Sequence, residues 1–454
     1  SSSAEAPEVE RLQLAEAPRA RRSTSSSRTY FGVDALLASV ESGAIAPLRG
    51  RWVVELEARG GKLQRRQDLP AEAFWSADEL RRVALALGDA FGVLFVALSY
   101  RWLSRAHPDP DGFHLKIVAA VAGLYLNLAG DRDGSEFPSA LTQAFTSHGL
   151  GEADFALFWD FASLHQEPRV GEQSSLFKLG LQSSNVWYGH ERSVCWMQSE
   201  LPAGFGGVAY DASGWCFVEA AISAAVKPSV QRLDLGLRTE KAMGCAYGPE
   251  EPPNPDCRLT HVCMRGRLPP PTPEKVERLL RTEKTFTNSS DVAKVAALYA
   301  AFFDEVVRAT ELHFRAVGWT VAEAAELCEA LPRFRALTSL DVSENKLGDA
   351  GVSVICQAVQ SNKEIKLASL NVSRNEIGPE GAKAVAAMAA VAASLTKILV
   401  GGNELGDEGT TILCDALRES TVSKVEELDL FNNDIGMDGA KAIAALCAVC
   451  PSLT

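Results

Sequence analysis

One glutamate in this 454-residue chain lies where a carboxylate could do chemistry, near the start of a predicted helix that follows an apolar run. It is Glu219, the last residue of the stretch Tyr-Asp-Ala-Ser-Gly-Trp-Cys-Phe-Val-Glu (210–219), which follows an apolar run at 194–197 and opens a helix-like run at 217–226. A helix that begins there places the Glu219 carboxylate one turn in, facing whatever lies beyond the strand ends. Such a group can stabilise positive charge that develops in a reaction. The alternative is that Glu219 is a solvated helix residue.

Polar residues also end the other apolar runs of this region. Ser99-Tyr100-Arg101 closes the run at 91–99, Asp160 closes the run at 155–160, and Gln-Ser-Glu (198–200) follows the run at 194–197. The carboxyl ends of parallel strands lie on one rim of a sheet, and ligands bind there. The sequence therefore predicts one polar site on that rim.

Each rim residue has a chemical use and a structural alternative. Arg101 can hold a phosphate as a bidentate donor, and Tyr100 or Trp215 can stack on an aromatic ring of a ligand. Arg101 can instead pair with Asp160, and Asp160 can cap the turn after its strand. Trp215 and the neighbouring Cys216 can pack in the core.

The elements that must position this rim alternate along the chain. Apolar runs predict strands at 91–99, 155–160, 194–197 and 230–235. Helical stretches are predicted at 113–128, 174–188 and 217–226. This alternation predicts an α/β fold class, with a doubly wound parallel-sheet domain at 91–235.

The flanking segments have their own patterns. Residues 1–30 are predicted to be a disordered tail. Residues 31–90 are predicted to form an N-terminal α/β extension, with a helix at 33–40, a strand at 52–58 and a second helix opened by the capping-box spacing Ser76-Ala-Asp-Glu79. Residues 236–320 are predicted to form a Pro- and Gly-rich loop followed by a connector of two helices, at 273–282 and 291–315.

From residue 321 to 454 the chain is predicted to form a solenoid of repeats. The pattern Leu-x-x-Leu-x-Val-x-x-Asn begins at 337 and returns, with conservative changes, at 367, 395 and 425, and Leu453 opens a further unit. Each Asn is followed by Lys or an acidic residue, then Leu or Ile, then Gly, and then an apolar helix. This pattern is that of the leucine-rich repeat and resembles the ribonuclease-inhibitor class. Because a strand opens at Leu453, we expect the array to be truncated.

The repeats predict a structural ladder and a binding face. The asparagines of the pattern are expected to bond backbone groups between successive turns. Exposed strand positions on the concave face are the candidates for binding a protein partner, which their mixed and partly acidic character predicts to be somewhat basic. These candidates are Asp341, Glu344, Asn371, Arg374, Leu399, Asp429 and Phe431. The alternative is a short solenoid that has no partner.

The region 91–235 resembles Toll/interleukin-receptor (TIR) domains, above all those of the plant type. The family's Ser-(Phe/Tyr)-Arg is matched at 99–101, its second-strand Asp at Asp160, and its Tyr-x(4)-Trp-Cys-x-x-Glu at 210–219. The resemblance implies that Glu219 is catalytic for NAD cleavage, that NAD is a substrate rather than a permanently bound cofactor, and that the domain self-associates. The NAD-binding residues that it implies are Ser99, Tyr100, Arg101, Asp160 and Trp215.

The chain departs from the plant TIR pattern in two features. The Gly-x-Asp that follows the Arg in plant TIR domains is replaced by Trp-Leu-Ser-Arg (102–105), and the connection between the first two strands is unusually long. The segments 99–102, 160–166 and 215–219 also resemble the fungal heterokaryon-incompatibility (HET) domain. Since HET domains are regarded as TIR-like, the two resemblances share a fold and differ only on activity.

Composition narrows the classes of function. A net charge of −13 disfavours a nucleic-acid partner. The longest apolar runs, 92–98 and 117–126, are shorter than the roughly 20 residues that a membrane-spanning helix needs. Scattered cysteines suit a reducing compartment, so the expected location is cytoplasmic. The seven His residues have no metal-ligand spacing, and no phosphate loop, His-Glu-x-x-His or Gly-x-Ser-x-Gly motif occurs.

Two hypotheses of different classes follow. In the first, the chain is an intracellular sensing or signalling protein whose repeats bind a protein and whose TIR-like domain hydrolyses NAD. In the second, it is a non-catalytic scaffold in which the TIR-like domain only self-associates.

Overall fold

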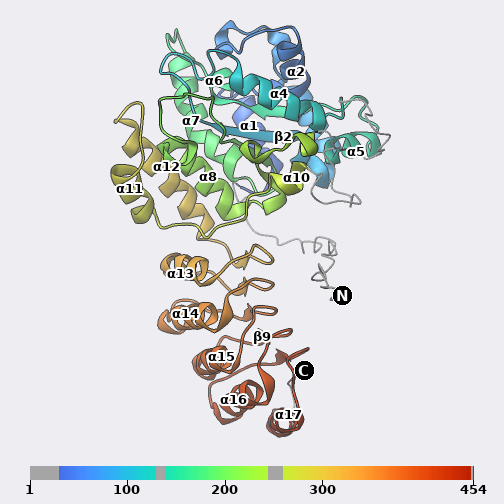
Figure 1. Cartoon of the computed structure of the whole chain (residues 1–454), viewed down its shortest axis with the longest axis vertical. Helices are drawn as coiled ribbons and strands as arrows, with labels where there is room; N and C mark the ends of the chain where they lie inside the picture. The colour runs from blue at the N-terminus through green and yellow to red at the C-terminus, as the bar shows by residue number, and fades with distance from the viewer. Residues whose placement is uncertain (1–29, 129–138, 244–258, 451–452, 454) are drawn as a thin grey trace, which may run out of the picture.

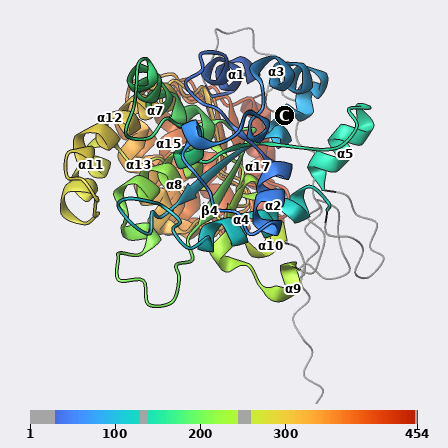
Figure 2. The same cartoon turned by 90° about the horizontal axis from the view of Figure 1, so that it is seen from above.

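The computed structural model describes residues 30–128, 139–243, 259–450 and 453. An α/β domain comes first, and a solenoid of repeats extends from it toward the C-terminus (Figure 1). Viewed along the long axis, the solenoid lies behind the α/β domain (Figure 2). The predicted disordered tail lies, except for Tyr30, outside the described residues.

The α/β domain is built on a five-stranded sheet in the order β1-β3-β2-β4-β5. The strands are β1 (Leu48–Arg49), β2 (Phe95–Tyr100), β3 (Ala156–Phe158), β4 (Val194–Gln198) and β5 (Arg232–Asp234). Strand β1 is antiparallel to β3, and the other neighbours are parallel. The predicted α/β class with a parallel sheet is confirmed. Because β3 lies on one side of β2 and β4 on the other, the topological switch point is between β2 and β4.

Helices cover both faces of this sheet, and two of them position the rim. Successive residues of a strand point to opposite faces. Ser99 bonds to Glu219 of α8 (Gly214–Val226), whereas the ring of Tyr100 packs edge-on against His114 of α4 (Phe113–Tyr125), with 5.2 Å between ring centroids. All six residues of β2 are buried, as expected for a strand that is covered on both faces.

The other helices of the domain complete its two layers and the connector. They are α1 (Val33–Glu41), α2 (Gly50–Ala58), α3 (Ala77–Ala86), α5 (Ala140–Ser147), α6 (Asp160–Ser163), α7 (Gln173–Gly189), α9 (Glu240–Met243), α10 (Leu259–Val262), α11 (Pro273–Thr282) and α12 (Asp291–Val306). The predicted helices at 113–128, 174–188, 217–226 and 273–282 are confirmed within a few residues.

The strand predicted at 52–58 is wrong, because these residues lie in helix α2. The letters Trp-Val-Val-Glu-Leu-Glu-Ala alternate loosely with a period of two. The residues that are buried, however, are Trp52, Val53 and Leu56, which follow the helical spacing of one, three and four. The extension at 31–90 also supplies β1, so it shares its sheet with 91–235.

Other predicted elements differ at their ends. Residues 88–94 form a 3-10 helix, so the predicted strand at 91–99 begins only at Phe95. The helix predicted at 291–315 ends at Val306, and the strand β6 (Glu311–His313) that follows joins the repeat sheet. Ser76 is the N-cap of α3 and accepts from the Glu79 N–H, but the Glu79 carboxylate bonds Arg49 instead of completing a capping box.

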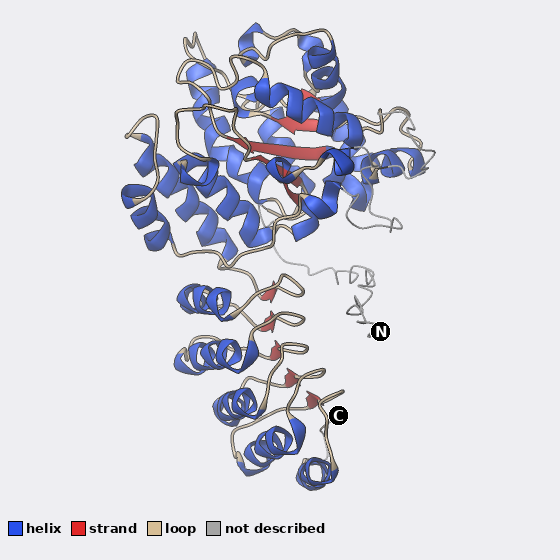
Figure 3. Cartoon of the chain, in the orientation of Figure 1, coloured by secondary structure: helices blue, strands red, loops and turns tan. Residues whose placement is uncertain are grey.

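The solenoid is a parallel sheet with one helix after each strand (Figure 3). After β6 its strands are β7 (Ser339–Asp341), β8 (Ser369–Asn371), β9 (Lys397–Leu399) and β10 (Glu427–Asp429). Its helices are α13 (Val321–Ala330), α14 (Gly348–Ser361), α15 (Pro379–Val391), α16 (Gly406–Glu419) and α17 (Met437–Val449). The central residues Leu340, Leu370, Ile398 and Leu428 stand in register, as the sequence repeat predicts.

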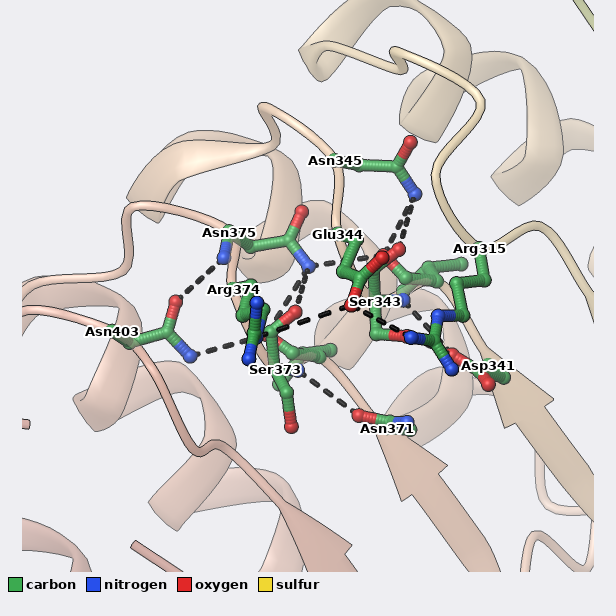
Figure 4. A network of polar contacts seen from close by, with 12 residues as sticks. Arg315, Asp341, Ser343, Glu344, Asn345, Asn371, Ser373, Arg374, Asn375 and Asn403 are labelled. Atoms are coloured by element: carbon green, nitrogen blue, oxygen red, sulfur yellow. Dashed lines mark hydrogen bonds and ion pairs between the residues drawn. The ribbon is translucent and has the colours of Figure 1, made fainter. Parts of the chain in front are cut away.

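The predicted asparagine ladder is confirmed. The amide N–H₂ of Asn375 donates to the carbonyls of Val342 (3.0 Å) and Val372 (3.1 Å), which belong to two successive repeats. Asn345, Asn403 and Asn433 make the corresponding bonds, and all four asparagines are buried. Figure 4 shows the ladder at Asn345, Asn375 and Asn403. Their role is therefore structural.

Candidate functional site

The Glu219 carboxylate lies at the switch point of the sheet, against the end of β2. Its Oε2 accepts a hydrogen bond of 2.6 Å from the Ser99 hydroxyl. That hydroxyl also lies 2.6 Å from the hydroxyl of Tyr210, in the short helix that follows β4. Ser99 and Tyr210 are buried, and Glu219 is partly buried. Residues from β2, from the loop after β4 and from α8 therefore meet here.

Burial changes the acidity of Glu219. Desolvation of the charged form raises the pKa of its carboxyl from 4.5 to about 8. The hydrogen bond from Ser99 opposes this rise, and the nearby charge of Asp160 adds to it. At neutral pH the carboxyl is mostly protonated unless a cation lies beside it.

Asp160 organises a second polar cluster at the end of β3. Its carboxylate accepts hydrogen bonds from the Tyr100 hydroxyl (2.7 Å) and from the Trp102 indole N–H (3.1 Å). It also accepts from the backbone N–H of Phe161 (2.6 Å), which agrees with the alternative that Asp160 caps the turn after its strand. Burial raises the pKa of both Asp160 and Tyr100.

Tyr100 and Arg101 differ in what they can offer a ligand. Tyr100 is only 5% exposed, and its ring packs edge-on against Trp159 and His114, so stacking on a ligand would require that packing to open. The alternative pairing of Arg101 with Asp160 is not found: across the described residues Arg101 forms no ion pair, and its buried Nε has no hydrogen-bond partner. Arg101 is thus the less engaged of the two side chains.

Trp215 and Cys216 contact different parts of the molecule. The Cys216 thiol is buried and donates to the Tyr100 carbonyl (3.3 Å), which agrees with the core-packing alternative. The Trp215 indole N–H donates to Asp291 (3.3 Å) at the start of α12. Trp215 is thus engaged by the connector, a contact that no local spacing could predict.

Tyr188 of α7 is a site residue that the sequence reasoning missed. Its hydroxyl donates to the Leu98 carbonyl (3.0 Å). Burial, and after it the charge of Glu219, raises the pKa of Tyr188, so the two side chains are neighbours. Tyr188 lies among apolar residues of a long helix and carries no spacing signal of its own.

Three properties of the described residues bear on other chemistries. They contain no group of three or more His, Cys, Asp or Glu side chains that could hold a metal ion. None of the helices in this part of the chain is long and apolar enough to cross a membrane. The eight cysteines described are free thiols.

The seven predicted binding residues fall into three groups, and Figure 4 shows four of them, Asp341, Glu344, Asn371 and Arg374. Asp341, Asn371 and Asp429 each accept from the backbone N–H two residues later and so hold the turn after their strand. Glu344 pairs with Arg315 (2.8 Å) and lies 3.9 Å from Arg374. Leu399 is partly buried, and Phe431 is 74% exposed.

A further column of charges lies in the loop after each strand. It consists of the residue that follows each ladder asparagine: Lys346, Glu376, Glu404 and Asp434, all exposed. The last three give this edge of the solenoid an acidic character. The sequence shows this column as the Lys or acidic residue after each Asn, but the predicted binding residues did not include it.

The comparisons with known proteins concern the repeats. The family described as Leucine Rich repeat matches residues 335–356, 365–386 and 423–444. The repeats are leucine-rich repeats of the ribonuclease-inhibitor type. The ribonuclease inhibitor of Mus musculus is 28% identical over 173 residues, which are 37% of this chain and 38% of that protein. NACHT, LRR and PYD domains-containing protein 3 of Macaca mulatta is 33% identical over 113 residues, 25% of this chain and 11% of that protein.

These relatives set the limits of the comparison. This chain spans less than two fifths of the length of either relative. Among solved structures, the leiomodin-1 actin-binding site 2 covers 32% of this chain and 79% of its own, at 17% identity and a TM-score of 0.26, which is too low to support an argument.

Proposed function

We propose that this chain is a two-part sensing or signalling protein, in which the solenoid binds a protein partner and the α/β domain cleaves NAD. The observation that carries the enzymatic half is the contact of Glu219 with Ser99 at the sheet switch point. Open α/β sheets bind ligands at that point. A buried carboxyl with a raised pKa is a common feature of catalytic sites.

The proposed reaction is hydrolysis of the bond between nicotinamide and ribose. The bond breaks with its electron pair leaving on nicotinamide, water adds to the ribose carbon, and the products are nicotinamide, ADP-ribose and a proton. The transition state has oxocarbenium character, so an ionised carboxylate beside the ribose stabilises it. The positive nicotinamide ring of NAD would lower the pKa of Glu219 and favour that ionised form. Arg101 would hold a phosphate.

The solenoid half of the proposal rests on its exposed charges. The acidic loop residues Glu376, Glu404 and Asp434 form one column and make no ion pair within the described part of the chain, which favours a partner with basic character. Ribonuclease inhibitor is, by its name, a protein that acts on another protein. A cytoplasmic location, suggested by the free thiols, belongs to the same proposal.

The function is tested by nicotinamide release from NAD, with dilute protein and under crowding that promotes assembly. Wild type should release nicotinamide, and Glu219→Gln should lose most of that release. The matched control is Glu200→Gln, which removes another rim carboxylate, one that pairs with Arg238 (2.5 Å). Equal loss in both variants would contradict a specific role for Glu219.

A non-catalytic scaffold is the second candidate. It is favoured by the occupied side chains of the site: Glu219 bonds Ser99, Tyr100 bonds Asp160, and Trp215 bonds Asp291. In that case wild type releases no nicotinamide at any concentration. Self-association of the α/β domain, measured by light scattering, would then be its remaining activity.

A further inference from the structure

A short segment of the connector is bound to the start of α8. The Thr285 N–H donates to the Ala212 carbonyl (2.8 Å), and the Gly214 N–H donates to the Thr285 carbonyl (3.0 Å). Ser213 and Thr285 thereby form a parallel bridge. We name residues 284–286 the strap. The backbone that it holds lies between Tyr210 and Glu219, the two residues that meet Ser99.

Side chains strengthen the same attachment. The Lys284 ammonium donates to the Asp211 carbonyl (3.0 Å) and lies 4.5 Å from the centre of the Phe217 ring. Just beyond the strap, Asp291 accepts from the Trp215 indole. The turn before α8 and its first turn are thus fastened to the connector at several points.

The strap approaches α8 closely at Gly214. A Cβ atom at this position would lie 2.0 Å from Cζ of Phe286, far closer than van der Waals contact allows. The aromatic ring therefore rests directly on the glycine, and a methyl group there would push the strap away.

The connector is also fastened to the solenoid. Lys275 of α11 pairs with Glu326 (3.3 Å) and Glu329 (3.1 Å) of α13. On α12, the Phe303 ring packs edge-on against Phe334, which follows α13, with 6.4 Å between centroids. Helices α11 and α12, with the strap between them, therefore bridge the first repeat and the start of α8.

We infer that the strap residues are positioning residues for Glu219, and that the α11–α12 bridge couples this site to the first repeat of the solenoid. A displacement of α13 would be transmitted to residues 210–216 through the strap. The expected effect on NAD turnover rests on the proposed function. The expected effect on the conformation of residues 210–216 does not depend on it.

The positioning role is tested with Gly214→Ala and with the double variant Gly214→Ala/Phe286→Ala. An extra methyl group in a filled space destabilises the structure around it. We therefore expect amide exchange at residues 210–216 to be about five- to hundredfold faster in the single variant than in wild type. The double variant, which removes the ring that the methyl group meets, should recover most of the protection. If NAD is cleaved, turnover should follow the same order.

Two results would overturn the positioning role. One is unchanged exchange at 210–216 in Gly214→Ala. The other is a double variant that exchanges as fast as the single one, which would place the defect in the helix backbone. If the exchange behaves as expected but wild type releases no nicotinamide, the proposed function fails while the strap inference stands.

The coupling is tested with Lys275→Met, which removes both ion pairs to α13. Because ion pairs near the surface are weak, we expect exchange at 210–216 to rise by about two- to fivefold, without a change in global unfolding. The control is Lys383→Met, which removes an exposed ion pair of α15 far along the solenoid. The coupling is excluded if the Lys275 variant changes exchange only within α11 and α13.

Discussion

At the scale of single residues, the site is a compromise between stability and chemistry. Glu219 is held in a position where its charge is poorly solvated, and its raised pKa records that cost. The short hydrogen bond from Ser99 offsets part of this desolvation cost. A purely structural position would be better filled by an uncharged side chain, so this arrangement favours a functional role.

The first prediction concerns the pH dependence of stability. The folded pKa of Glu219, about 8, is higher than the unfolded value of 4.5. Between these values the unfolded chain releases a proton that the folded chain keeps, so Glu219 lowers the free energy of unfolding as pH rises from about 4.5 to 8. We expect Glu219→Gln, which can still accept from Ser99, to be more stable than wild type at pH 8 by roughly 2 kcal/mol or more.

The measurement is urea unfolding of both proteins at several pH values. The difference in the free energy of unfolding should be small at pH 5 and grow toward pH 8. A difference that does not change with pH would show that Glu219 titrates normally. Glu200→Gln serves as the control, since its carboxylate is 42% exposed.

At the scale of elements, two of the repeats cap the helix of the repeat that follows them. The Asp407 carboxylate accepts from the backbone N–H groups of Gly436 (2.7 Å) and Gly439 (2.8 Å) at the start of α17. Asp349 makes the same pair of bonds to the start of α15. A carboxylate at a helix N-terminus satisfies free N–H groups and complements the helix dipole.

The second prediction is that Asp407→Ala destabilises α17 by about 1 kcal/mol, the usual cost of losing an N-terminal cap. Amide exchange in α17 should therefore accelerate several-fold, while α13 stays unchanged. Asp438→Ala is the matched control, because Asp438 also opens a helix but bonds only Lys441 among the described residues. Equal effects of the two substitutions would contradict the capping role.

The sequence predicted elements well where one local pattern dominates. The repeats follow from the 28- to 30-residue period, and β4 and α8 follow from uninterrupted apolar runs. The prediction was wrong at 52–58, where the letters fit a strand but burial follows a helix. The partner of Trp215 is 76 residues away and the strap meets α8 across a similar separation, so neither contact leaves a local trace.

At the scale of the whole molecule, the acidic loop column is the surface feature on which the proposed binding of a basic partner rests. Glu376, Glu404 and Asp434 occupy equivalent positions in successive repeats. Neighbouring strands of a sheet are roughly 5 Å apart, so these charges form a closely spaced row. Such a row attracts a basic surface and accelerates its association at low salt.

The third prediction is that changing all three residues to Lys weakens binding of a basic protein probe by about tenfold at low salt. The control changes Glu380, Glu408 and Asp438 to Lys, which alters the net charge equally but on the helix starts. Calorimetry at two salt concentrations measures both. Equal weakening by the two sets would mean that only net charge matters, and the loop column would lose its assigned role.

The central claim is that Glu219 carries out NAD chemistry in its ionised form, and the pH profile of nicotinamide release tests it most directly. We predict that kcat/KM rises with pH toward about 8, the pKa of the free carboxyl, and that kcat rises at lower pH because bound NAD brings a positive ring beside it. Glu219→Gln should lose both the activity and the profile. Release that does not depend on pH, or that persists in Glu219→Gln, would contradict the account.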